Sequence, residues 1–316
     1  MKKFIAAAAQ YAPEFLDTQA GVARAIEIIQ QAGKEGVRLL AFPETWLQGY
    51  LYWAGAPRTA EFRMLYQRLF EQSIEVPGPE ILRLAKAAGE ARVNVSIGLH
   101  ERVGASIYNT TVYLGSDGSF LGRHRKLMPT TNERLVWAMG DGSDLEGYDT
   151  DAGRIGGLTC WENHMALARY ACAELGVQTH IAAFPGVAFL DDVVDAAVRQ
   201  LAFENGCAVV LAREVMSQDR LPKDIASIVT SEPQYWAAHG GSAIVAPGGS
   251  YVTRPVFEQE GLVLGEIDLG LIPRIKLWYD ATGHYARPDV FRMVWDRRPK
   301  PAVQRIESAP DVGDLN

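Results

Sequence analysis

Short apolar runs that predict buried strands alternate with amphipathic helical segments along most of this chain. Residues 4–10, 37–42 and 179–184 are apolar runs of strand length, and the segment 19–33 carries apolar residues at helical spacing. This alternation is typical of a layered α/β protein. A Ser-Asp-Gly-Ser turn at 116–119 adds a hairpin, so we expect mixed rather than purely parallel sheets.

The same patterns locate the individual elements. The expected strands are 4–10, 37–42, 94–101, 108–114, 120–125, 154–160, 179–184, 207–213, 242–246, 251–256 and 262–268. The expected helices are 19–33, 79–91, 165–175, 191–205 and 270–277.

The 316 residues show no composition break, linker or repeat before about residue 296. We therefore expect one domain over 1–296 and a polar tail over 297–316. The net charge of −7 argues against nonspecific binding to nucleic acid or to anionic membranes. No apolar stretch approaches the roughly 20 residues of a membrane span, and the run after Met1 is read as the first strand rather than a signal peptide. Three sparse cysteines without metal spacing predict free thiols and a cytoplasmic protein.

The segment LTCWENH, residues 158–164, places a cysteine where a buried strand runs into a helical pattern. Cys160 would then lie at the carboxyl edge of a sheet near a helix amino end, where the helix dipole favours a thiolate. A single cysteine is more often a small buried apolar residue. The functional interpretation, a cysteine nucleophile, depends on what other segments bring to the same edge.

Two further segments supply groups that such a nucleophile needs. Glu44 ends the apolar run LLAFPETW, and Lys126 and Glu133 lie in HRKLMPTTNER. A carboxylate can take the thiol proton and later activate water, and a lysine ammonium can stabilise the negative charge that develops on the attacked group. Taken singly, these residues could be a surface carboxylate, a solvated lysine and an exposed glutamate paired with Arg134. A Cys–His site is the weaker reading, because no partner that could orient His124 or His164 is visible in the sequence.

The segments FPETW, HRKLMPTTNER and CWEN, in that order, resemble the three signatures of the nitrilase (carbon–nitrogen hydrolase) superfamily. GDG at 140–142 and GHYARPDV at 283–290 are similar to the true nitrilase branch, and the resemblance covers roughly residues 4–292. It implies a four-layer α-β-β-α sandwich with two mixed β-sheets. It also implies a homodimer that can build larger spirals, and chemistry without a cofactor or a metal.

The resemblance also implies residue roles. Cys160 would be the nucleophile, Glu44 the general base and Lys126 the group that stabilises the intermediates. Glu133 would orient Lys126 or the substrate nitrogen. The candidates for lining the pocket of a small nitrile substrate are Tyr50, Trp161, His164, Phe184 and Phe189.

Three functions stay open at this point. The first is a nitrilase that forms acid and ammonia through a thioimidate and a thioester. The second keeps the site but acts as an amidase or carbamoylase, or hydrates a nitrile to an amide. The third is an inactive scaffold protein with the same fold, which the intact Glu44, Lys126 and Cys160 set disfavours.

Overall fold

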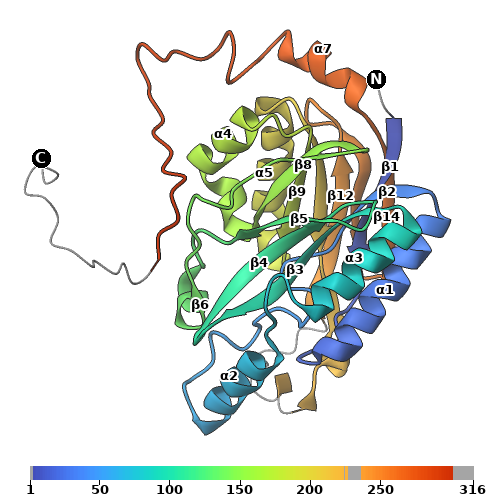
Figure 1. Ribbon diagram of the computed structural model, residues 1–316, viewed down its shortest axis with the longest axis vertical. Helices are drawn as coiled ribbons and strands as arrows, with labels where there is room; N and C mark the ends of the chain where they lie inside the picture. The colour runs from blue at the N-terminus through green and yellow to red at the C-terminus, as the bar shows by residue number, and fades with distance from the viewer. Residues whose placement is uncertain (1–2, 224, 227–235, 302–316) are drawn as a thin grey trace, which may run out of the picture.

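Two β-sheets lie face to face, with helices on both outer faces (Figure 1). The computed structural model describes residues 3–223, 225–226 and 236–301. Helices α1 and α3 cover one sheet, and α4 and α5 lie on the far side of the other. The expected α-β-β-α order of layers is therefore confirmed.

The first sheet has the order β14-β1-β2-β3-β4-β5, with β6 paired to β4. Strands β1, β2 and β3 are parallel to one another, whereas the β1–β14, β3–β4 and β4–β5 pairs are antiparallel. Its strands are β1 Lys3–Gln10, β2 Val37–Ala41, β3 Asn94–Val103, β4 Ser106–Leu114, β5 Phe120–Arg125, β6 Trp137–Ala138 and β14 Gly261–Asp268.

The second sheet has the order β11-β12-β10-β9-β8-β7, with β13 paired to β12. Strands β8, β9 and β10 are parallel, so their carboxyl ends meet at one edge. Its strands are β7 Tyr148–Thr150, β8 Gly153–Thr159, β9 Thr179–Phe184, β10 Ala208–Arg213, β11 Val215–Ser217, β12 Trp236–Val245 and β13 Tyr251–Phe257. Both sheets are mixed, as the sequence predicts.

The helices match the sequence pattern except in one region. The α-helices are α1 Thr18–Lys34, α2 Ala60–Gln72, α3 Pro79–Ala91, α4 Ala166–Glu174, α5 Asp191–Glu204 and α7 Ile272–Lys276. Helix α2 was not predicted, although Phe62, Leu65 and Leu69 are its buried residues and Thr59 caps its first turn. Its arginines, glutamates and glutamines hide this short apolar face in the sequence.

Small side chains let β1 pack on both faces. Ala7 and Ala9 lie in the core shared with α1 and α3, whereas Ala6 and Ala8 lie in the core between the two sheets. All four are fully buried, and alanine is narrow enough for a second layer to approach closely. The alanine run is therefore a central strand of the first sheet, between β14 and β2.

The carboxyl-terminal segment beyond α7 extends along the outside of the molecule (Figure 1). Its last described part is held to the body: the Lys300 N–H donates to Asp141 Oδ2 at 2.7 Å, and Arg297 pairs with Glu146. Of the predicted tail 297–316, residues 302–316 lie outside the described residues. Among the helices of the described ranges, none is long and apolar enough to cross a bilayer.

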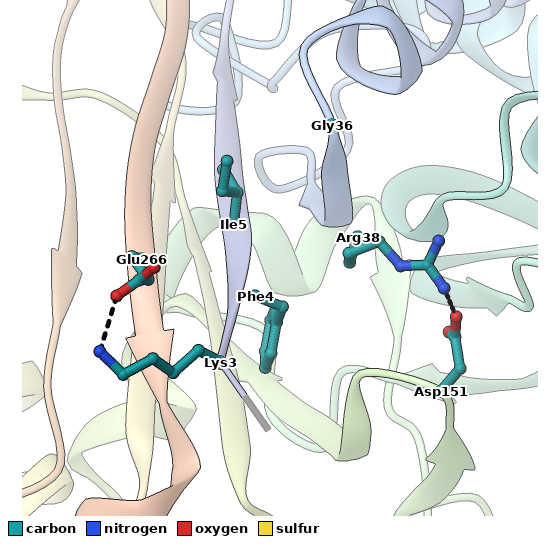
Figure 2. A pocket seen from close by; sticks show the side chains of 7 residues that line it. All are labelled: Lys3, Phe4, Ile5, Gly36, Arg38, Asp151 and Glu266. Carbon is teal, nitrogen blue, oxygen red and sulfur yellow. Dashed lines mark hydrogen bonds and ion pairs between the residues drawn. The ribbon is translucent and has the colours of Figure 1, made fainter. Parts of the chain in front are cut away.

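A pocket of about 420 Å³ opens at the amino ends of β1 and β2. Figure 2 shows that Lys3 points to Glu266 and Arg38 to Asp151, and both contacts are ion pairs. The charged side chains of this pocket therefore pair with one another. Glu44 follows the other end of β2, so the candidate site lies at the opposite edge of the sheet.

Candidate active site

Cys160 begins a short 3-10 helix, Cys160–His164, directly after β8. Its φ of 54° lies in the left-handed region, which a non-glycine residue rarely adopts. The Asn163 amide holds this turn by donating to the carbonyls of Leu158 and Cys160, both at 3.0 Å, and Asn163 Oδ1 lies 2.9 Å from the His180 ring. The turn fixes where the thiol points.

Glu44 follows β2 in a tight turn against β3. A Cβ on Gly98 would come within 2.4 Å of the Thr45 nitrogen and 2.5 Å of the Pro43 oxygen, so the close approach of β3 requires glycine there. Glu44 is fully buried, and its Oε1 accepts from Asn109 Nδ2 at 2.7 Å. No hydrogen-bond partner of its Oε2 is found among the described residues.

Lys126 joins two buried carboxylates. Its Nζ lies 2.7 Å from Glu44 Oε1 and 2.7 Å from Glu133 Oε2. Glu133 lies in the 3-10 helix Thr131–Leu135, where its Oε2 also accepts from the Thr130 N–H at 2.6 Å. The Trp137 ring lies below the ammonium, 5.4 Å from Nζ to the ring centroid. Burial with two anionic partners keeps the lysine in one place and charged.

Glu162 connects the cysteine turn to the lysine segment. Its Oε2 accepts from the Thr159 N–H at 2.8 Å and its Oε1 from the Leu127 N–H at 2.6 Å. His124 Nε2 lies 3.1 Å from Glu162 Oε2. Burial opposes the charged forms, but each partner stabilises the other, so the pKa of His124 is raised to about 10 and that of Glu162 is lowered. This buried pair sets the spacing between Cys160 and Lys126.

The electrostatics of the site favour a neutral thiol and a charged lysine. Burial raises the pKa of Cys160 well above its ordinary value, the Glu44 charge raises it further, and Lys126 opposes both. Burial alone would lower the pKa of Lys126, but the buried carboxylates of Glu44 and Glu133 raise it. Burial is also the main reason that the pKa of Glu44 rises to about 7.

The expectation that a helix dipole holds Cys160 as a thiolate is therefore wrong for the resting site. Helix α4 begins at Ala166, and the intervening 3-10 turn separates the cysteine from its first turn. Desolvation and the Glu44 carboxylate outweigh Lys126 and the Trp161 N–H. The thiol needs a base that removes its proton, and Glu44 has a pKa suited to that.

The structure brings together Glu44, Lys126 and Glu133 by direct contacts, and Cys160 interacts electrostatically with all three. Tyr50 belongs to the same cluster, because its hydroxyl donates to Glu133 Oε1 at 2.6 Å.

The other predicted pocket residues lie beyond Cys160. The centroid of the His164 ring lies 4.7 Å from that of Trp161 and 6.4 Å from that of Phe184. Phe184 is buried, whereas Trp161 is partly exposed. Phe189 is 85% exposed and is not brought into the buried cluster by this chain. Of the aromatic residues near Glu44, Trp46 and Trp53 are fully buried core residues.

Sequence reasoning did not single out Asn109, Glu162 or Glu214 as site residues. Asn109 is a polar residue within the strand SIYNTTVYL, which is the only sequence signal for it. The partners of Glu162 and Glu214 are distant in sequence and depend on packing. Within the described ranges, no group of three or more His, Cys, Asp or Glu side chains is arranged to hold a metal ion.

Comparison with known proteins places the chain in a family. A model of the carbon-nitrogen hydrolase family matches residues 5–276. "Nitrilase 2" from an unknown prokaryotic organism is 40% identical over 299 residues, 93% of this chain and 93% of that protein. "Aliphatic nitrilase" from Sinorhizobium fredii (strain HH103) is 38% identical over 308 residues, 96% of this chain and 99% of that protein.

A solved structure of similar fold is the carbon-nitrogen hydrolase from Helicobacter pylori G27. It has a TM-score of 0.71 at 19% identity and covers 88% of this chain and 94% of that chain. At this identity the likeness supports the fold alone. The family match over most of the chain confirms the superfamily predicted from the three motifs. This chain is a member of the carbon-nitrogen hydrolase family.

Proposed function

We propose that this chain is a nitrilase that hydrolyses a small nitrile to a carboxylic acid and ammonia. The observation that carries the proposal is the buried cluster in which Glu44 and Glu133 hold the Lys126 ammonium beside Cys160. The two relatives at 38–40% identity, both named as nitrilases, support the nitrile as the substrate class.

In the first half of the reaction, Glu44 accepts the Cys160 thiol proton and Sγ adds to the nitrile carbon. The carbon–nitrogen triple bond becomes a double bond, and the nitrogen takes up the proton to give a covalent thioimidate. A base whose pKa is near 7 suits this transfer, because it is partly ionised at neutral pH and can return the proton. Lys126 stabilises the negative charge that develops on the nitrogen.

In the second half, Glu44 activates water for attack on the thioimidate carbon. The tetrahedral intermediate collapses with protonation of the nitrogen, and ammonia leaves a thioester on Cys160. A second water attacks in the same way, and the Cys160 sulfur leaves and regains its proton as the acid is released. Two waters are consumed per nitrile, and no cofactor or metal is required. Glu133 keeps Lys126 in position throughout.

Tyr50, Trp161, His164 and Phe184 are proposed to line the substrate site around these groups. Tyr50 is tied to Glu133, and the rings of Trp161, His164 and Phe184 form one aromatic group next to Cys160. Phe189 is proposed to reach the site only where a second protomer covers its exposed ring.

Ammonia release from purified protein tests the proposed activity. Aliphatic, aromatic and arylacetonitrile substrates are compared with their matching amides, and the products are identified by mass. We expect nitriles to yield acid and ammonia in equal amounts. Turnover of amides alone would replace the nitrilase with an amidase, amide accumulation would indicate a nitrile-hydrating enzyme, and no turnover at all would favour the inactive scaffold.

The pH dependence of the reaction depends on Glu44. Since its pKa is raised to about 7, the fraction of carboxylate and hence kcat/KM should rise with pH around a midpoint near 7. The Asn109 hydrogen bond stabilises the carboxylate, so Asn109→Leu should raise the pKa and move the midpoint upward by about one pH unit. Asn205→Leu is the control, because the Asn205 side-chain amide donates to the Arg169 carbonyl instead of to Glu44. A midpoint that Asn109→Leu leaves in place would remove Glu44 as the base.

We propose one domain over 1–296, a homodimer that can build spirals, and a cytoplasmic location. Exposed Leu167 and Phe189, together with Leu277 and Trp278 after α7, support self-association. The three free, buried cysteines fit a reducing compartment.

A further inference from the structure

Glu214 is a buried carboxyl at the same sheet edge as Cys160, but the reaction above does not use it. It follows β10, and Cys160 follows β8. The register pairs Thr159 with Ala183 across β8 and β9, and Ala183 with Ala212 across β9 and β10. Neighbouring strands are about 4.8 Å apart, so the two backbones are separated by roughly 10 Å. At that separation, Cys160 and Glu214 could contact opposite ends of one small substrate.

The Glu214 carboxyl lacks a cationic partner among the described residues. Its Oε1 accepts from the Tyr52 hydroxyl, and its Oε2 is buried without a hydrogen-bond partner within the described ranges. The adjoining Arg213 does not neutralise it, because its guanidinium bonds Asp191 and the Val187 carbonyl. A buried carboxyl with a free oxygen is costly unless a ligand completes its hydrogen bonds.

Two tyrosines connect this carboxyl to the catalytic cluster. Tyr50 donates to Glu133, its ring meets the Tyr52 ring edge-on at 5.5 Å, and Tyr52 donates to Glu214. Both tyrosines are partly exposed, whereas both glutamates are buried behind them. The tyrosines therefore form a continuous wall that runs from Glu133 to Glu214.

The charges around Glu214 favour an added cation. Burial raises the pKa of Glu214 to about 8, the Tyr52 hydrogen bond lowers it, and the Glu44 charge raises it further. The other nearby ionisable groups, Arg213 and His239 on β12, both have Asp191 as their partner. A positive group beside Glu214 would supply the missing hydrogen bonds and offset the negative charge.

We propose that Glu214 and Tyr52 form a subsite for an ammonium group, so that the preferred substrates are nitriles with a primary amine several bonds from the nitrile carbon. The proposal rests on the proposed nitrilase function. The nitrile carbon would lie at Cys160, and the ammonium would donate to Glu214 Oε2. The alkyl chain between them would lie along Tyr50 and Tyr52.

The wild-type protein gives the first test. The ratio of kcat/KM for an ω-aminonitrile to that for the methyl-terminated nitrile of equal length is measured across pH, for several chain lengths. An alkylammonium ionises near pH 10.4, so it stays charged while Glu214 loses its proton around pH 8. The ratio should therefore rise with pH around a midpoint near 8. The ionisation of Glu44 affects both substrates and cancels in the ratio. A ratio that is flat or falls with pH overturns the subsite.

Variants give the second test. Glu214→Gln should lower the ratio about tenfold or more, mainly through KM, and should abolish its rise with pH. Tyr52→Phe removes a hydrogen bond that lowers the pKa of Glu214, so the midpoint of the ratio should move to higher pH. Glu174→Gln, an exposed change at the end of α4, is the control.

The two proposals can fail separately. If Glu214→Gln keeps the wild-type ratio while nitriles are hydrolysed, only the subsite is wrong. If no nitrile is hydrolysed by the wild-type protein, the proposed function is wrong. Competitive inhibition of neutral-nitrile turnover by n-alkylamines gives an independent binding measurement. Equal inhibition by the amines and by the matching alcohols would also overturn the subsite.

Discussion

Cys160→Ala should abolish nitrile hydrolysis, with kcat reduced about 10⁴-fold or more, as is found when a covalent nucleophile is removed. The pocket and the Lys126 contacts remain in this variant, but no atom can form the thioimidate. Cys160→Ser should leave at most a trace, since a hydroxyl is harder to deprotonate than a thiol and Glu44 has a pKa of only about 7. Ammonia release gives the rate, and thermal unfolding shows whether the variant is folded.

The other two cysteines are matched controls for this experiment. Cys172 and Cys207 are also free and buried, but they pack in the apolar cores around α4 and α5. Cys172→Ala and Cys207→Ala should lower the melting temperature slightly and leave kcat close to that of the wild type. Activity near the wild-type level in Cys160→Ala, or a loss confined to one of the controls, would contradict a Cys160 nucleophile.

Lys126→Met should abolish activity and also destabilise the fold. The substitution leaves the buried Glu44 and Glu133 carboxylates without their shared cation. Breaking a buried ion pair by removing one partner costs about 3–5 kcal/mol. Lys126 lowers the pKa of Glu44 in the wild type, so this pKa rises in the variant. The variant should therefore be least destabilised at low pH, where the Glu44 carboxyl is protonated, and more destabilised as pH increases. Urea unfolding at several pH values measures the loss of unfolding free energy and its pH dependence, and ammonia release measures the loss of activity.

Lys86→Met is the control for the destabilisation. Lys86 also pairs with a glutamate, Glu90, but the two side chains are 74% and 56% exposed. Its loss should cost less than about 1 kcal/mol at any pH. Adding Glu133→Gln to Lys126→Met should restore part of the stability without restoring activity. Equal destabilisation by the two lysine changes would show that Lys126, Glu44 and Glu133 do not form a buried charge network.

The predictable part of the fold is the part set by local pattern. Apolar runs located β1 to β5 and β8 to β10, which position the site, and Pro79 marked the start of α3, whereas the short strands β6 and β7 were not predicted. Helix α2 was missed because its apolar face has only three buried residues among charged and amide side chains. The order of the layers depends on long-range packing, so the local pattern could not predict it. The resemblance to a family supplied that prediction instead.

The candidate site divides in the same way. Glu44, Lys126 and Cys160 could be proposed because each lies at or just beyond the end of a predicted strand. The ionisation state of Cys160 could not be predicted from the sequence. It depends on burial and on the Glu44 carboxylate, which lies more than a hundred residues earlier in the chain. Asn109, Glu162 and Glu214 were missed for the same reason: their importance comes from partners that only the fold brings to them.

Mass analysis of the protein quenched in acid during nitrile turnover, followed by peptide mapping, tests the central claim most directly. The claim is that the Glu44–Lys126–Glu133 cluster lets Cys160 carry the substrate covalently. The predicted result is a substrate-derived acyl or imidoyl group on the peptide that contains Cys160, which is absent before nitrile is added and after it is exhausted. Acid formation with an adduct on Cys172 or Cys207, or with no adduct at any time during turnover, would contradict it.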